Sequence, residues 1–256
     1  MAMPEITVRG AGIFGLSIAW ILTCRGARVQ VVDPYGAGAG SSGGLVGALA
    51  PHVPENWNEK KAFQLESLLM AEAFWANVLS VGGGDPGYGR TGRLQPIADD
   101  QALALARARC DGARDLWQGR AVWEVISVED AGAFAPLSPS GFVIQDTLTG
   151  RMHPRQACAA LVAALRARGV DIASDAPDRG AVIWATGWRG LLGLSEEIGK
   201  SVGAGIKGQS AALAYDAGPV PQVFVDGLYI IPHANGTVAI GSTSEREYDS
   251  PDSLDA

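Results

Sequence analysis

The sequence has little of what nucleic-acid-binding, metal-binding and disulfide-stabilised proteins need. Only 18% of its 256 residues are charged and the formal net charge is −7, with no Lys/Arg run to neutralise nucleic-acid phosphates. The three cysteines, Cys24, Cys110 and Cys158, lack metal-ligand spacing and are too few for a disulfide framework. Such a sparse set fits reduced thiols in a reducing compartment. We therefore expect no nucleic-acid partner, no metal site and a cytoplasmic location.

Long apolar runs are also missing, since none approaches the roughly 20 residues that cross a bilayer. Residues 10–24 come nearest to the apolar part of a secretory signal, but no basic segment precedes them and glycines interrupt them. The sequence therefore predicts no membrane span. An apolar fraction of 47% in a chain of this length describes a globular protein with a substantial core, as one large domain or two smaller ones.

What the chain does contain is a nucleotide-binding pattern at residues 5–33, EITVRGAGIFGLSIAWILTCRGARVQVVD. Gly10, Gly12 and Gly15 match G-x-G-x-x-G between two predicted strands. Asp33 follows Gly10 by 23 residues, near the offset of about 20 expected for a ribose-binding acid. A helix that begins near Gly12 directs its free N–H groups and positive dipole end at phosphates. Chance glycines in a tight turn are the alternative, but the flanking strands, helix and acid favour dinucleotide binding.

Hydrophobic periodicity predicts an α/β fold with two interleaved domains. The expected elements are strands at 5–8, 28–32, 94–97, 170–173 and 181–185, with further strands beginning near 121 and 141, and helices at 12–25, 59–79, 99–117 and 154–168. After Lys200 the pattern becomes antiparallel sheet, and Asn235-Gly236 between two apolar runs predicts a hairpin. This order predicts a nucleotide-binding domain at 1–81 and 150–199, and a second domain at 82–149 and 200–256.

A glycine- and serine-rich loop, GAGAGSSGGLVGALAP, occupies residues 36–51. Its composition alone is typical of a flexible linker. Its position directly after the ribose-binding acid, and its apolar end at Val46 and Leu49, favour contact with the ligand instead.

Four blocks together resemble the flavin-dependent amine oxidase family that includes D-amino-acid oxidase, sarcosine oxidase and glycine oxidase. They are VRGAGIFGLSIAW, SSGGLVGALAPH, GRMHPRQACAALVAALRARGV followed by VIWATGW, and YIIPHANGTVAIGSTSE, and they occur in family order. The last block, with the preceding IKGQS, is most similar to the glycine oxidases of thiamine biosynthesis. The resemblance implies FAD as cofactor, held by a Rossmann-like domain that is interleaved with an antiparallel-sheet substrate domain.

The resemblance also implies which residues contact FAD. The diphosphate would lie on Gly10, Ala11, Gly12, Ile13, Phe14 and Gly15. The adenosine ribose would be bound by Asp33, with Pro34 beside it. The loop residues Ser41, Ser42, Gly47, Ala48 and Leu49 would wrap the flavin side, and Ala185, Thr186 and Gly187 would close over the other face. Relatives have a longer excursion between the strands near Val170 and Val182, so Val170 is the one adenine contact expected here.

For the substrate, the resemblance places the family's binding tyrosine at Tyr229, a pocket-limiting residue at Ser244, and a residue close to the flavin ring at His52. Each has a simpler explanation: core packing for Tyr229, a polar strand end for Ser244, and a structural role for His52. Of the other histidines, we expect His153 to begin a helix and His233 to be solvated. Trp184 and Trp188 flank the ATG block and are expected to serve packing.

These residues imply FAD-dependent oxidation of a small amino acid or amine by hydride transfer to flavin N5, with oxygen as acceptor and an imino acid and hydrogen peroxide as products. One alternative is a D-amino-acid dehydrogenase that passes electrons to a quinone. Another is a non-catalytic FAD-binding module, because family members continue beyond the position of Ala256 with a substrate-carboxylate arginine. On that comparison the sequence is either a fragment or an impaired version. The oligomeric state is left open, with a homo-oligomer as one option.

Overall fold

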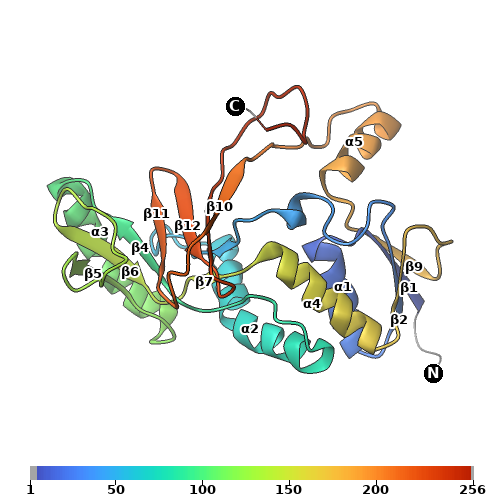
Figure 1. Ribbon diagram of the computed structural model, residues 1–256, viewed down its shortest axis with the longest axis horizontal. Helices are drawn as coiled ribbons and strands as arrows, with labels where there is room; N and C mark the ends of the chain where they lie inside the picture. Colours follow the sequence, from blue (N-terminus) through green and yellow to red (C-terminus); the bar gives the residue numbers. More distant parts are fainter. Residues whose placement is uncertain (1–4, 255–256) are drawn as a thin grey trace.

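The computed structural model describes residues 5–254, and two lobes are visible in it, each built around its own β-sheet (Figure 1). The first lobe has a four-stranded parallel sheet in the order β8 (Asp171–Ala173), β2 (Arg28–Val32), β1 (Glu5–Arg9) and β9 (Ala181–Trp184). The second has a seven-stranded sheet in the order β10 (Ser210–Ala214), β13 (Thr237–Gly241), β12 (Leu228–Pro232), β11 (Gln222–Val225), β4 (Arg93–Pro96), β6 (Phe142–Asp146) and β5 (Trp123–Ser127). The predicted α/β fold with an interleaved antiparallel sheet is confirmed.

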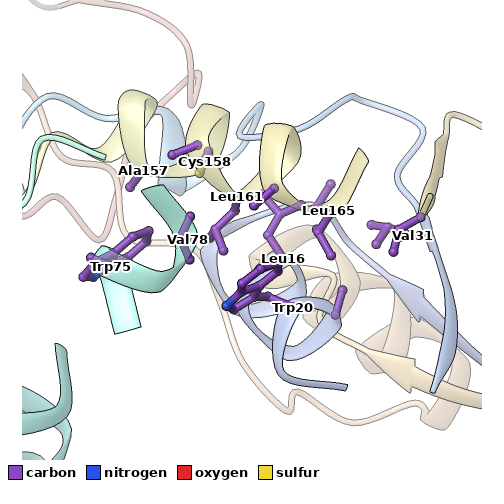
Figure 2. Close-up of a cluster of buried hydrophobic side chains, with 14 of the residues drawn as sticks. Leu16, Trp20, Val31, Trp75, Val78, Ala157, Cys158, Leu161 and Leu165 are labelled. Atoms are coloured by element: carbon purple, nitrogen blue, oxygen red, sulfur yellow. The ribbon is translucent and has the colours of Figure 1, made fainter. Parts of the chain in front are cut away.

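The core of the first lobe lies between the parallel sheet and three helices, α1 (Ile13–Cys24), α2 (Glu59–Gly82) and α4 (Pro154–Ala167). Figure 2 shows side chains from these helices meeting over the sheet: Leu16, Trp20, Trp75, Val78, Ala157, Cys158, Leu161 and Leu165, with Val31 from β2. Leu16, Leu161 and Leu165 are fully buried, and each contributes on the order of 2 kcal/mol by leaving water. This packing fixes the N-terminus of α1 relative to the sheet.

Local sequence signals set the helix ends close to where they were expected. The Asn58 side chain accepts a hydrogen bond from the N–H of Lys61 at the start of α2, and Gly83 ends that helix in the left-handed region. The Asp99 side chain caps α3 (Asp100–Trp117) in the same way. His153 caps α4 ahead of Pro154, so its prediction as the residue that begins a helix is confirmed.

The second lobe assembles from two separate parts of the chain. β4, β5 and β6 come from the middle of the sequence, whereas β10 to β13 come from its last quarter, and the two groups join where β11 pairs in parallel with β4. The predicted hairpin at Asn235-Gly236 is confirmed, because β12 and β13 pair across it. A buried ion pair, Arg93 Nε to Asp146 Oδ2 at 2.9 Å, joins the neighbouring strands β4 and β6.

Two short strands connect the lobes. β3 (Ala48–Leu49) pairs with β7 (Gly150–Arg151) between the two sheets, and a short 3-10 turn, η1 (Ser41–Gly43), precedes β3. The helix α5 (Gly187–Ile198) follows β9 where the sequence predicted only a strand end, and Figure 1 shows it above the parallel-sheet lobe. The domain boundaries at 81/82, 149/150 and 199/200 stay a prediction, and their outer limits at residues 1 and 256 lie outside the described residues.

Within residues 5–254, every helix is too short or too polar to cross a bilayer. The same stretch holds no group of three or more His, Cys, Asp or Glu side chains placed to ligate a metal ion.

Candidate functional site

A cleft of about 660 Å³ opens where β1, β2 and β9 end. The carboxyl ends of neighbouring parallel strands are where α/β proteins bind their ligands. The structure brings most of the expected FAD contacts together here. They are Gly10, Gly12, Ile13, Phe14, Asp33, Pro34, Ser41, Ser42, Ala185, Thr186 and Gly187. These residues come from segments up to 177 positions apart, so the fold assembles the cleft from the first βαβ unit, the glycine-rich loop and the start of α5.

The turn from β1 into α1 is packed too tightly for side chains at two of its glycines. Gly10 has φ +110°, and a Cβ there would lie 2.2 Å from the carbonyl oxygen of Ala185. A Cβ on Gly15 would lie 1.8 Å from the carbonyl oxygen of Gly10. Gly10 and Gly15 therefore have the structural roles that the sequence motif predicts: the chain turns sharply at Gly10, and α1 lies directly against the strand at Gly15.

Two polar side chains hold this turn in place. Asp33 Oδ2 accepts a 2.7 Å hydrogen bond from the N–H of Ala11, and Oδ1 accepts one of 2.9 Å from the N–H of Tyr35. Ser42 Oγ accepts a 2.9 Å hydrogen bond from the N–H of Ile13, in the first turn of α1. The N-cap residue of α1 is Gly12, which has no side chain to cap the helix. At this residue the main chain itself therefore lines the cleft.

A second cavity, of about 390 Å³, adjoins the first and shares Gly40, Ser41, Trp188 and Arg189 with it. Its other walls are Leu45 and Val46 of the glycine-rich loop, Lys207 and Gly208, and Ser210 and Ser242 from the edge of the antiparallel sheet. The two cavities therefore lie side by side, and together they extend from the glycine turn of the first lobe to the second lobe.

The glycine-rich loop is fixed between the two lobes and is not a free linker. The Met152 N–H donates to the Gly47 carbonyl oxygen at 2.8 Å, and Ala48 and Leu49 form β3 against β7. Ala48 and Leu49 therefore lie in the connecting strand with Gly47 directly before it, and none of the three lines either cavity. A Cβ on Gly47 would lie 2.1 Å from the Met152 carbonyl oxygen, so this approach requires glycine.

His233 contributes to the same anchoring, and its expected solvation is wrong. Its side chain is 3% exposed, and its Nε2 lies 3.0 Å from the Leu45 carbonyl oxygen. A carbonyl oxygen only accepts, so Nε2 carries the proton and donates. The His153 ring packs against it with centroids 4.7 Å apart, and burial lowers the pKa of both imidazoles below its ordinary value. Neutral His233 thus ties the β12–β13 hairpin to the loop.

Four other expected contacts are not among the residues that line the two cavities. Val170 precedes β8 at the amino end of the parallel sheet, 7% exposed, in a separate surface depression. The cleft forms at the carboxyl ends instead, so Val170 is not brought to it. His52 is held by Gln64 of α2, Ser244 is exposed beyond the end of β13, and Tyr229 is half-buried in β12 with its ring 4.5 Å from that of Phe224.

The cleft also contains residues that sequence reasoning missed. Tyr35, Trp184, Trp188 and Arg189 all line it. Trp184 is 68% exposed and therefore does not pack in the core, and the Arg9 guanidinium lies 5.7 Å from its ring centroid. Tyr35 and Trp188 directly follow predicted contacts in the sequence, and that adjacency was the signal available for them.

Comparison with solved structures finds the same fold in other proteins. A glycine oxidase from Geobacillus kaustophilus superposes with a TM-score of 0.76 at 18% identity, covering 97% of this chain and 74% of that one. The iminodiacetate oxidase IdaA from Chelativorans sp. BNC1 superposes with a TM-score of 0.74 at 19% identity, covering 94% and 72%. At these identities the likeness establishes the fold alone.

Sequence comparison gives the family. A candidate thiamine biosynthesis oxidoreductase, ThiO, from Rhizobium etli is 32% identical in an alignment 175 residues long, and the alignment covers 63% of this chain and 46% of that protein. The matched region thus spans about half the length of this curated relative. The family model described as "FAD dependent oxidoreductase" matches residues 5–256. The resemblance inferred from the four sequence blocks is confirmed, with FAD as the family's cofactor. This chain belongs to the family of FAD-dependent oxidoreductases that is named DAO.

Proposed function

We propose that the chain binds FAD along the two joined cavities and oxidises a small amino acid or amine, in the manner of a glycine oxidase. The observation that carries this proposal is that the two cavities adjoin and together extend from one lobe to the other. One end is the bare glycine turn at the N-terminus of α1, and the other is enclosed by the glycine-rich loop and the antiparallel sheet. FAD has a planar ring system on each side of its diphosphate, so a diphosphate at the glycine turn would let one of the two rings lie in the second cavity.

The residues present fit a diphosphate at the glycine end. Gly12 is in the extended conformation immediately before α1, and the first-turn N–H groups of that helix have no intrahelical acceptor. Asp33, half-exposed at the end of β2, already accepts two main-chain hydrogen bonds and has further lone pairs available for ribose hydroxyls. A Cβ on Gly12 would lie 3.1 Å from Ser42 Oγ, so a side chain at this position would occupy the space proposed for the diphosphate.

On the substrate side, the topology favours Tyr229. Tyr229 pairs with Phe224 across β11 and β12, so both side chains leave the same face of the sheet. Gln222 shares that face because it is two residues from Phe224, and its Nε2 donates to the Gly150 carbonyl oxygen of β7 at 3.2 Å. That face is therefore directed at the connecting strands that carry the loop. Opposite Tyr229 stands Gly241, which has no side chain to cover the tyrosine.

When bound, FAD would accept a hydride from the α-carbon of the substrate, and the work left to this chain is orientation. We propose that the Tyr229 hydroxyl donates to the substrate carboxylate and that Ser244 limits the size of the pocket. His52, fixed by Gln64 on α2, would close the loop beside the ring. The substrate amine would bind uncharged, so no residue is needed as a general base.

The decisive experiment is reconstitution of the purified chain with FAD, followed by assays with glycine, sarcosine and D-alanine. Peroxide release under air with one of these amines supports an oxidase. Dye reduction without oxygen, in the absence of peroxide, would replace the oxygen proposal with a dehydrogenase that passes electrons to a quinone. Stoichiometric FAD binding without turnover by either route would leave only the non-catalytic FAD-binding module. The cytoplasmic location and the oligomeric state stay predictions.

A further inference from the structure

Arg189 is the feature of the cleft that the proposed function does not use. It lies in the first turn of α5 and lines both cavities where they join. Its guanidinium carbon is 4.6 Å from the ring centroid of Tyr35 and 4.7 Å from that of Trp188. Tyr35 belongs to the segment after β2, so the guanidinium bridges the two walls of the cleft.

The charge of Arg189 has no anionic partner within the part of the chain that the structure describes. No carboxylate among residues 5–254 lies within ion-pair distance of it, whereas Arg9, the other cation that lines the cleft, pairs with Asp178 at 2.8 Å. Arg9 also donates to the Ala176 carbonyl oxygen and lies over Trp184. Arg189 is therefore the cation of the cleft that remains available to a ligand.

The position of Arg189 is electrostatically unfavourable without an anion nearby. The N-terminus of a helix carries a partial positive charge, so a cation in the first turn is repelled by the dipole, typically by a fraction of a kcal/mol. The first turn of α5 contains no acidic residue to offset this repulsion. A bound anion would remove the conflict, because both the helix end and the guanidinium would then face negative charge.

We propose that Arg189 binds the diphosphate of FAD from the side opposite the glycine turn, with Tyr35 and Trp188 holding its guanidinium in position. This inference rests on the proposed FAD site and extends it. The α1 N-terminus supplies only dipoles and N–H groups, whereas Arg189 supplies the full positive charge that a diphosphate dianion favours. A cation held by two rings also loses little side-chain freedom when the ligand arrives.

The test measures binding of FAD, ADP and adenosine to the flavin-free protein by calorimetry, because ADP and adenosine differ in the diphosphate. The variant Arg189→Met keeps an unbranched apolar stem without the charge, and Arg189→Lys keeps the charge without the planar group. Arg114→Gln serves as the matched control, since Arg114 is exposed on α3, far from the cleft in sequence, and forms an exposed ion pair with Asp111. Thermal unfolding of each variant confirms that it is folded.

We expect Arg189→Met to weaken FAD and ADP binding about tenfold, the effect of losing one charge-assisted contact, and to leave adenosine binding unchanged. Arg189→Lys should recover part of the loss, and the wild-type affinity for ADP should fall more steeply with salt than that of Arg189→Met. Unchanged ADP and FAD affinity in Arg189→Met would overturn the role of Arg189 while leaving the FAD site intact. If Arg189→Met lost as much affinity for adenosine as for ADP, Arg189 would not act on the diphosphate, and its role would be limited to packing. If the wild type binds neither FAD nor ADP, both this inference and the proposed function fail.

Discussion

Replacing Gly15 by alanine tests whether the close approach of α1 to β1 is required. Gly15 lies inside α1, where alanine is normally favoured over glycine by about 1 kcal/mol. A Cβ at this position would lie 1.8 Å from the carbonyl oxygen of Gly10, and real Cβ atoms essentially never come within 3.0 Å of such an atom. The obstacle is main chain, which cannot rotate away, so the helix would have to move by more than ~1 Å.

We therefore expect Gly15→Ala to reduce stability. Overpacking of this kind costs about 3 kcal/mol, the upper part of the usual range, and the helix propensity of alanine returns about 1 kcal/mol. The free energy of unfolding should fall by about 2 kcal/mol. Urea unfolding followed by far-UV circular dichroism measures this difference, and FAD binding should weaken in parallel because the helix N-terminus shifts.

The chain offers a matched control in Gly193, which lies in the helix α5 with open space around its Cβ position and without a positive φ. Gly193→Ala should be neutral or stabilise the protein by about 0.5–1 kcal/mol. If Gly15→Ala were as stable as wild type, or behaved like Gly193→Ala, the close packing of the glycine turn would be refuted.

Three further variants probe the rest of the site. Asp33→Ala removes the acceptor for the Ala11 and Tyr35 N–H groups, so the free energy of unfolding, measured by denaturation, should fall by about 1–3 kcal/mol. The affinity for FAD, measured by calorimetry, should fall at least tenfold, and an unchanged affinity would contradict the ribose role of Asp33. Tyr229→Phe should raise KM for the amino acid about tenfold without changing FAD affinity, and an unchanged KM would return Tyr229 to a packing role. Burial lowers the pKa of His233 and His153, so the unfolded state binds more protons below pH ~6.5 and stability should fall as the pH drops through that value. His233→Gln should flatten this dependence in melting experiments from pH 7.5 to 5, and an unaltered slope would show that His233 does not cause it.

The first βαβ unit could be predicted from sequence because its determinants are local. Gly10, Gly12 and Gly15, the two β-branched strands and Asp33 all lie within about 30 residues and each specifies the same turn. The structure adds the reason for the spacing, which is the contact of Gly15 with the Gly10 carbonyl group. The hairpin at Asn235-Gly236 was predictable for the same reason, because the Asn-Gly pair that forms the turn is itself the sequence signal.

The parts that escaped prediction depend on distant contacts or on weak local signals. His233 flanks a turn and was expected in solvent. It is buried instead, and its ring is hydrogen-bonded to Leu45, 188 residues away in the sequence. Helix α5 was missed because Gly190 and Gly193 lower its propensity. The structure explains Gly190, whose Cβ would collide with the Thr186 hydroxyl group at 1.7 Å. Arg189 belongs to no motif, and its contact with Tyr35, which lies far away in the sequence, depends on the fold.

The central claim is that the N-terminus of α1 holds the diphosphate of FAD, with the flavin ring directed toward the antiparallel sheet. A crystal structure of the chain with FAD tests it most directly. We predict density for the diphosphate against the N–H groups after Gly12, the ribose at Asp33, and the ring in the cavity between Leu45 and Ser242. FAD bound with its diphosphate away from the glycine turn, or with its ring directed away from the second lobe, would contradict this account.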